Sequence, residues 1–344
     1  MLKCSEVIND HNLHKTEANH ISPIDNCVVC ENYVSHRNKY ITARKEYEKD
    51  AESQLKSSDL IVSADLQKVI MLPRADMFKE VIFTRRIIAF NESFVAVGKG
   101  RNVRPLGILW HEGISGRKKE DIVSSFYAFF LKNRDKESIT IWLDNCSAQN
   151  KNWCLFSFFI YIVNATEVNL KQLTIKYFER GHTFMSADHF HHQVEKSLKR
   201  AKTVWDFNDY VQCVLNSTKQ TDVAALEIRN FYKWTDLSSK YKLQKLTPRC
   251  YLNNISLAIF TRGEKTLKYK NSYDAEDLIE LNFLTAGAFK TGVTIPPSRT
   301  SNRGISQERK QHLLNNLQDI IPGNRRNFWE ELPVGDAAEE EENG

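Results

Sequence analysis

Two patterns of hydrophobic and polar positions alternate between residues 59 and 202, and together they predict strands followed by helices. Short apolar runs predict strands within "DLIVSADLQKVIMLP", "EVIFTRRIIAFNESFVAVG", "RPLGILWHEG", "SITIWLD" and "LKQLTIKYFERG". Apolar residues at helical spacing predict helices within "KKEDIVSSFYAFFLKN", "NKNWCLFSFFIYIVN" and "SADHFHHQVEKSLKRAK", the last capped by Ser186. The order β-β-β-α-β-α-β-α predicts an α/β fold with helices on both faces of a mixed sheet.

The rest of the chain divides by texture around this core of residues 59–202. A Cys/His segment (1–36) precedes a highly charged stretch (37–58) without Gly or Pro, which predicts an exposed helix. An accessory region (203–292) mixes helical and strand-like segments. The last part (293–344) holds a Pro/Ser/Gly linker, the amphipathic "ISQERKQHLLNNLQDII" and an acidic tail, so we expect the C-terminal part to be α-rich.

The composition favours a globular protein inside the cell. Of the 344 residues, 41% are hydrophobic and 26% are charged, which is typical of soluble domains. No apolar run reaches the roughly 18 residues that span a membrane, and "MLKCSEVIND" lacks the apolar core of a signal peptide. Seven mostly scattered cysteines favour reduced thiols. The net charge of +5 permits a polyanionic partner without demanding one.

Carboxylates recur at comparable places in this order of elements. Asp65 lies inside the first predicted strand, Asp144 ends the fourth, and Asp188 and Glu195 lie on the helix after the fifth. If the first and fourth strands are neighbours, Asp65 meets Asp144 and the helix adds a third acid. Two Mg²⁺ or Mn²⁺ ions about 4 Å apart need such an oxygen-rich cluster, where they activate water and stabilise a leaving oxygen. The order therefore predicts a two-metal site for phosphodiester chemistry.

Each acid also has an ordinary structural explanation. An aspartate at a strand end, such as Asp144, often forms a turn. Asp188 stands in the first turn of its helix, where it favours the helix dipole. Glu195 is placed to pair with Lys199 one turn later. Only the combination of two strand acids and a helix acid points to chemistry.

Polar residues accompany these acids along the chain. The histidines are His182, His191 and His192, and the amides are Gln149, Asn150 and Asn152. The histidines are suited to orienting a carboxylate or contacting a phosphate, or else form an exposed polar stripe. The amides line the same site or touch DNA, or else cap the following helix.

Long segments of the sequence are familiar. The specific ones are "DNCSAQNKN" and "GHTFMSADHFHHQVEKSLKR", and shorter ones are "CVVCENY", "DLQKVIMLP", "RRIIAFN", "WHEGISGRKKEDIVSSF" and "ISQERKQHLLNNLQDIIP". In this order they resemble an uncharacterised, transposon-derived domain family whose members look like transposases of the acidic-triad (DDE/D) type. The resemblance covers roughly residues 20–325.

The resemblance implies a ribonuclease H-like fold with Asp65 and Asp144 at catalytic, metal-binding positions. Related transposases end their last motif in an Ile-Glu-like pair, so "QVEK" makes Glu195 the preferred third ligand and Asp188 the reserve. It further implies two Mg²⁺ or Mn²⁺ ions, DNA cleavage and strand transfer, and a nuclear location. Where many relatives carry Gly this chain has Ala148, and relatives commonly extend further upstream, so a domesticated or decayed, inactive DNA- or chromatin-binding protein is the alternative.

Cys27 and Cys30 form a C-x₂-C pair, which is half of a tetrahedral zinc site. The candidates for closing it are Cys4, His11, His14, His20 and His36. None of them forms a second pair with regular spacing, so an incomplete or lost zinc finger is an equal interpretation.

Basic clusters occur at "FTRRI", "GKGRNVR", "GRKK" and "KSLKRAK". They suit a phosphate track around a metal site, or simply a solvated surface. A third interpretation is self-association through the charged helix and the C-terminal helix.

Overall fold

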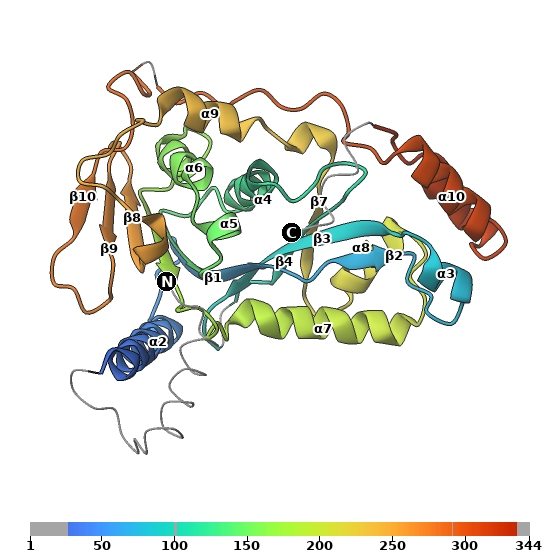
Figure 1. Ribbon diagram of the computed structural model, residues 1–344, viewed down its shortest axis with the longest axis horizontal. Coiled ribbons are helices and arrows are strands. Elements are labelled where there is room, and N and C mark those ends of the chain that lie inside the picture. The colour runs from blue at the N-terminus through green and yellow to red at the C-terminus, as the bar shows by residue number, and fades with distance from the viewer. Residues whose placement is uncertain (1–26, 100–101, 291, 336–344) are drawn as a thin grey trace.

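Residues 27–99, 102–290 and 292–335 are described in the computed structural model of the chain. They form one mixed sheet of ten strands flanked by helices (Figure 1), so the predicted α/β class is confirmed. In chain order the strands are β1 (Asp59–Leu66), β2 (Ile70–Leu72), β3 (Ile87–Ala96), β4 (Leu106–His111), β5 (Ser138–Leu143), β6 (Gln172–Tyr177), β7 (Asp222–Ala225), β8 (Leu257–Thr261), β9 (Leu267–Lys270) and β10 (Ile279–Leu281).

Strand β1 lies inside the sheet, and its two neighbours run in opposite directions. It pairs antiparallel with β3 and parallel with β5. Beyond β3 follow β4 and β7, and β2 also pairs with β3; beyond β5 follow β6, β8, β9 and β10. Because β1, β5 and β6 are parallel, their carboxyl ends meet at one edge of the sheet. Ligands of open α/β sheets usually bind outside such an edge.

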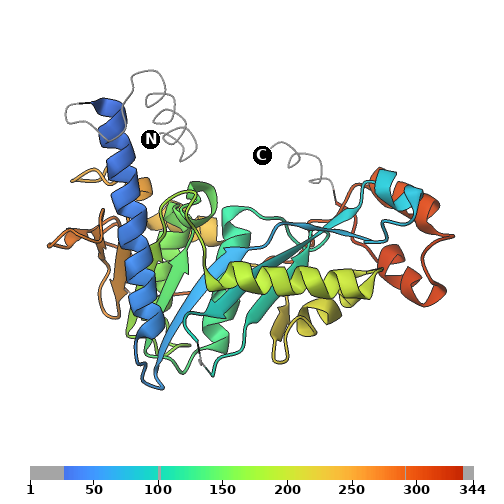
Figure 2. The same cartoon turned by 90° about the horizontal axis from the view of Figure 1, so that it is seen from below.

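Helices cover both faces of the sheet, as Figures 1 and 2 show. Helices α4, α6 and α9 pack on one face, and α7, α8 and the long α2 pack on the other. The helices are α2 (Val28–Glu52), α3 (Lys79–Phe83), α4 (Lys119–Lys132), α5 (Ser147–Asn150), α6 (Trp153–Asn164), α7 (Ser186–Ala201), α8 (Phe207–Leu215), α9 (Trp234–Tyr241), α10 (Gln307–Leu317) and α11 (Arg326–Glu330), with short 3₁₀ turns η1 (Ile228–Asn230), η2 (Leu252–Asn254) and η3 (Gly323–Arg325). Within the described ranges, no helix has the length and apolar character needed to cross a bilayer.

Alternation along β1 determines which of its residues reach which face. Leu60 and Val62 are buried in the cluster that contains the aromatic residues of α4 and α6. The intervening residues face α7, since Ser63 Oγ accepts a hydrogen bond from the Ala187 backbone N–H at 2.9 Å. Two residues further along the strand, Asp65 points to the same face as Ser63. The alternation along β1 thus places the Asp65 carboxylate on the face of the sheet that α7 covers.

Several boundaries in the N-terminal half differ from the sequence-based expectation. The charged helix begins at Val28 rather than at residue 37. The run before Pro73 is interrupted between β1 and β2, and "KEVIF" forms the short helix α3 instead of a strand. Of that apolar run only Val81 is buried, so it has no two-sided core to join as a strand. Met185, not Ser186, stands at the capping position of α7.

The C-terminal part contributes strands as well as the expected helices. Residues 203–292 supply β7 to one edge of the sheet and β8–β10 to the other. The amphipathic C-terminal helix is α10, which begins after Ser306, whose side chain accepts the Arg309 backbone N–H at 3.2 Å. The acidic tail lies outside the described residues. The sheet is therefore completed by residues far downstream of the predicted core.

Candidate functional site

The parallel pair β1 and β5 brings Asp65 and Asp144 together. Ser63 lies opposite Trp142 in the register of these strands, so Asp65 lies beside Asp144, which directly follows β5. The expectation that the first and fourth predicted strands are neighbours is confirmed. Both carboxylates stand at the carboxyl edge of the sheet.

Asp144 is oriented by the polar segment that follows it. Its Oδ1 accepts hydrogen bonds from the Cys146 backbone N–H at 3.0 Å and from Asn150 Nδ2 at 2.5 Å. Asn152 has a different role, because its Oδ1 accepts the Leu155 backbone N–H and caps α6. The Asn152 Nδ2 donates to the Gln149 carbonyl at 2.9 Å. Among the predicted amides, Asn150 binds the Asp144 carboxylate, whereas Asn152 caps α6.

Burial and neighbouring charges shift the protonation of Asp65 and Asp144. Burial raises the pKa of Asp65 to about 8, and the charges of Asp144 and Asp188 add to this effect. Burial also raises the pKa of Asp144, to which Asp188 contributes, while hydrogen bonds from Cys146 and Asn150 oppose the rise. The three acids that interact in this way are therefore Asp65, Asp144 and Asp188.

A fourth carboxyl group, Glu92, was not anticipated from the sequence. It lies on β3, opposite Leu66 of β1, and is almost completely buried. Burial, followed by the charges of Asp65 and Asp144, raises the pKa of Glu92 well above its ordinary value. The sequence signal that could have identified Glu92 is the polar triplet "NES" inside an otherwise apolar strand, because buried polar runs of this kind are unusual in a sheet.

The acids of α7 line a cleft of about 700 Å³ beside the end of β1, called here the acidic cleft. Its lining consists of Asp65, Gln67, Lys68, Val69, Ile70, Met71, Arg74, Asp76, Arg86, Asp188, His191, His192 and Glu195. Asp188 is exposed at the first turn of α7, where its Oδ2 also accepts the Met185 backbone N–H at 2.9 Å. Glu195, two turns further along, bonds to Arg74 Nη1 at 3.3 Å. Of the two, Asp188 is the acid that interacts with Asp65 and Asp144.

His191 reaches the acid cluster from α7. Its Nδ1 lies 3.5 Å from Asp65 Oδ2. Burial lowers the pKa of His191 to about 4, so the ring is neutral near pH 7 and the contact is not an ion pair. Its Nε2 is buried and has no hydrogen-bond partner among the described residues. His192 also lines the acidic cleft but is exposed.

His182 lies elsewhere. Its ring stacks on Tyr40 of α2, with 3.9 Å between centroids, and lies 5.2 Å from the ring of His36. Burial, followed by the charge of His36, lowers the pKa of His182. This predicted supporting residue therefore helps to pack α2 against the loop before α7 and is not brought to the acids.

Lys151 is a buried lysine close to the site. Its Nζ donates to the carbonyls of Asn253 at 3.2 Å and Ile255 at 2.7 Å, and it lies 4.3 Å from the centroid of the Tyr177 ring. Burial lowers the pKa of Lys151 to about 7, and the nearby charge of Asp144 opposes this shift. Lys151 thus fastens the η2 turn beneath the segment that carries Asp144.

The C-x₂-C pair stands at the start of α2. Cys27 precedes the helix and Cys30 is buried in its first turn. A hydrogen bond from the Cys30 backbone N–H is the main cause that lowers the pKa of Cys27. Four of the proposed closing ligands, Cys4, His11, His14 and His20, lie outside the described residues. The fifth, His36, lies 3.5 Å from Glu179, so zinc binding stays a prediction.

The donor set of the acid cluster suits a hard divalent cation. In the ranges that the structure describes, no three His, Cys, Asp or Glu side chains are already gathered closely enough to hold a metal ion. The carboxylates of Asp65, Asp144 and Asp188 nevertheless repel one another in a partly desolvated place. A cation bound by their oxygens would relieve that repulsion, as Mg²⁺ and Mn²⁺ do in carboxylate sites.

Comparison with known families identifies one similarity. Residues 122–272 match the model of a domain of unknown function (DUF7869), which is less than half of the chain. The matched segment contains Asp144, Asp188 and Glu195, whereas Asp65 lies before it. No curated protein and no solved structure matches the sequence.

Proposed function

We propose that this protein is a transposase-related enzyme that cleaves or joins DNA strands with the help of Mg²⁺ or Mn²⁺. The observation that carries the proposal is the convergence of Asp65, Asp144 and Asp188. They come from two neighbouring parallel strands and a helix, and burial, with a contribution from their mutual repulsion, raises the pKa of Asp65 and of Asp144. Strongly perturbed acids in a cleft are typical of functional sites.

The order of the central strands supports a ribonuclease H-like core. Strands β4, β3 and β1 are joined antiparallel, and β1, β5 and β6 follow in parallel. This is the arrangement that the sequence resemblance implies, with one acid on the first strand, one after the fourth and one on the helix after the fifth. Fold alone does not establish activity, so the acids remain the main argument.

Basic residues that line the acidic cleft are suited to binding the phosphate backbone of a nucleic acid. Lys68, Arg74 and Arg86 line the same cleft as Asp65 and Asp188. Arg86 and Arg74 are already paired, with Asp76 and Glu195 respectively. A phosphate backbone in the cleft would compete for these guanidinium groups, since phosphates are strong bidentate partners of arginine. A DNA substrate would place the protein in the nucleus.

The protein's own side chains prepare the site. Asp65, Asp144 and Asp188 are the residues that would hold the divalent ions, which when bound activate a water or hydroxyl and stabilise the leaving oxygen. Asn150 and the Cys146 backbone N–H keep the Asp144 carboxylate oriented. His191, neutral and close to Asp65, positions that carboxylate from α7.

The decisive experiment replaces Asp144 with Asn. The new side chain can still accept the hydrogen bonds that Asp144 accepts from Cys146 and Asn150, so we expect the fold to persist. Removal of the negative charge should reduce Mg²⁺- or Mn²⁺-dependent nicking of supercoiled plasmid by on the order of a thousandfold. Nicking is measured as conversion of supercoiled to open-circular DNA on agarose gels.

The matched control is Asp76→Asn. Asp76 lies on the rim of the same cleft, is exposed and pairs with Arg86. This variant should retain nicking within a few-fold. Equal metal-dependent activity of the wild type and Asp144→Asn would show that this cluster is not the catalytic site.

A second candidate function is DNA or chromatin binding without catalysis. It is favoured by one observation, the bond between Arg74 and Glu195, the acid that the sequence resemblance favoured as third ligand. An inactive descendant would bind DNA with an affinity that falls steeply as salt rises, and would leave the plasmid intact at any Mg²⁺ or Mn²⁺ concentration. Both properties together would support this candidate over the enzyme.

A further inference from the structure

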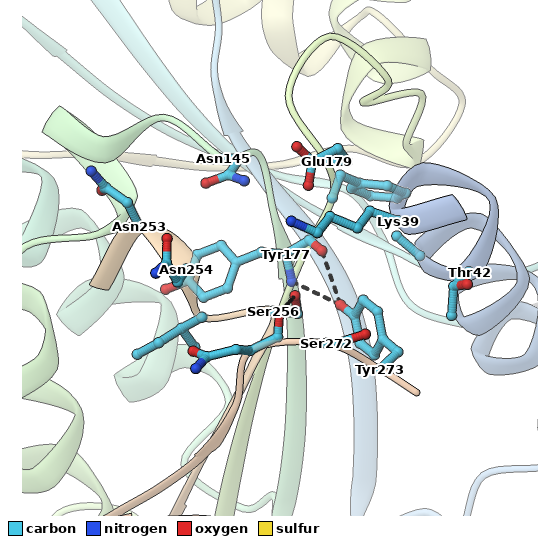
Figure 3. A pocket seen from close by; sticks show the side chains of 14 residues that line it. Lys39, Thr42, Asn145, Tyr177, Glu179, Asn253, Asn254, Ser256, Ser272 and Tyr273 are labelled. Carbon is cyan, nitrogen blue, oxygen red and sulfur yellow. Dashed lines mark hydrogen bonds between the residues drawn. The ribbon is translucent and has the colours of Figure 1, made fainter. Parts of the chain in front are cut away.

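A second cavity lies next to the segment that carries Asp144. It encloses about 200 Å³ between the end of β6, α2, η2 and the turn after β9. In Figure 3, Asn145, Glu179 and Lys39 line its upper side, and Asn254, Ser256 and Ser272 lie below. A space of this size admits a small group.

Asn145 is the unusual residue of this cavity. It is 9% exposed, and its Oδ1 has no hydrogen-bond partner among the described residues. A buried amide oxygen without a partner costs about 1–3 kcal/mol, so such atoms are rare in folded proteins. Asn145 lines the cavity, and its Oδ1 is an acceptor that the described protein leaves without a donor, as a ligand with an N–H group would supply.

The remaining lining is polar but nearly uncharged. Lys39 and Glu179 are its two oppositely charged members, and amides and hydroxyls supply most of the rest. A lining of this kind does not favour a bare phosphate or a cation. Amides present one donor and one acceptor side by side, which matches the hydrogen-bonding edge of a nucleobase.

Tyr177 belongs to the cavity lining, and hydrogen bonds fix the position of its buried side chain. Its backbone N–H donates to Tyr273 Oη at 3.0 Å, and Tyr273 Oη donates back to the Tyr177 carbonyl at 2.9 Å (dashed lines in Figure 3). The Tyr177 hydroxyl donates to the Asn150 carbonyl at 2.9 Å. The cavity wall is thus tied to the same residue whose side chain holds Asp144.

We infer that this cavity binds one unstacked nucleobase of the DNA strand whose backbone lies at the acid cluster. The inference rests on the proposed function, because it assumes that DNA is the ligand. Asp144 and Asn145 are adjacent in sequence, with the first directed to the acids and the second lining the cavity. A strand crossing the end of β5 therefore meets both, and Lys39 at the cavity is placed for an adjacent phosphate. Proteins that unstack a base recognise it in this way, by hydrogen bonds to its edge beside an aromatic ring.

The test compares two short oligodeoxythymidine strands, one with 2-aminopurine at its centre and one with an abasic residue there. Binding is measured without divalent metal by fluorescence anisotropy of an end label, so that no cleavage is needed. The wild type should bind the strand with the base about tenfold more tightly. Asn145→Leu should bind both strands equally, and should fold because the Asn145 oxygen makes no bond within the described protein.

Two further variants complete the test. Ser272→Phe fills the cavity from another segment and should also abolish the preference, whereas the matched control Asn302→Leu, at an exposed linker position, should keep it. Equal binding of both strands by the wild type, or a preference that survives both cavity variants, would overturn the inference. Asp144→Asn should retain the preference, so failure of the catalytic proposal and failure of the base pocket give different results.

Discussion

Two carboxylates at the carboxyl ends of strands β1 and β4 have contrasting surroundings. Glu112, just after β4, is held by Arg309 of α10, with 3.0 Å between Nη1 and Oε2, and by Arg303 at 3.4 Å. Its Oε1 also accepts the Ile88 backbone N–H at 2.8 Å. Asp65, at the end of β1, has other acids as its charged neighbours.

The difference separates an acid whose charge is compensated within the fold from one whose charge is not. Glu112 is compensated by two guanidinium groups, so its charge secures α10 against the sheet. Asp65 is desolvated beside Asp144, and the charge of the exposed Asp188 adds to the repulsion, so the ionised form of Asp65 opposes folding unless a cation compensates it. Burial alone does not distinguish the two carboxylates; their partners do.

The largest expected effect is a loss of stability when Glu112 loses one of its two arginine partners. Arg309→Met keeps much of the side-chain volume but leaves Glu112 buried without its main partner. We expect a loss of about 3–5 kcal/mol in the free energy of unfolding, measured by urea denaturation. Arg326→Met, at an exposed arginine of α11, is the control and should change stability by about 0.5 kcal/mol or less. A loss equal to that of the control would show that the ion pair does not hold α10.

Asp65→Asn is expected to increase the free energy of unfolding, in contrast to Arg309→Met. The folded-state pKa of Asp65 is about 8, whereas the unfolded chain has an ordinary value near 3.9. Between these values the folded state binds more protons, so wild-type stability falls as pH rises from about 4 to about 8. The substitution removes this cost and should stabilise the protein by up to a few kcal/mol near pH 8 and hardly at all near pH 4. Thermal melting over that pH range measures it, and a stabilisation independent of pH would contradict the explanation.

The smallest expected effect is stabilisation by Mn²⁺, which distinguishes Asp188 from Glu195 on α7. Mn²⁺ at ten times its dissociation constant should stabilise the wild type by about 1.4 kcal/mol, seen as a rise in melting temperature. Asp188→Asn should lose most of this rise, because Asp188 interacts with Asp65 and Asp144. Glu195→Gln should keep it, because Glu195 pairs with Arg74. The reverse result would make Glu195 the third ligand.

Much of the central architecture could be predicted from apolar patterning. The strands ending near Asp65 and Asp144 and the three main helices of the core were identified because their apolar residues repeat at the spacing of buried elements. Helix α3 was missed because its apolar residues are mostly exposed. Strands β7–β10 were not resolved within the accessory region because short edge strands with partly exposed residues leave only a weak alternating pattern.

The candidate acids of the site could be predicted from the sequence, but the long-range contacts that distinguish them could not. Asp188 and Glu195 lie on one helix, and sequence motifs favoured Glu195. Their distinction depends on Arg74, which reaches Glu195 from a segment 121 residues away. Glu92 and Lys151 are likewise brought to the acids by strand pairing and by the η2 turn, which local sequence does not encode.

The inner position of β1 has a consequence during synthesis. This strand leaves the ribosome early, but its antiparallel partner β3 ends at Ala96 and its parallel partner β5 at Leu143. Until both have been translated, an apolar segment has two unpaired edges, which is the condition that favours misassociation of nascent chains. Chaperone dependence of this protein should therefore be concentrated in the interval before β5 emerges.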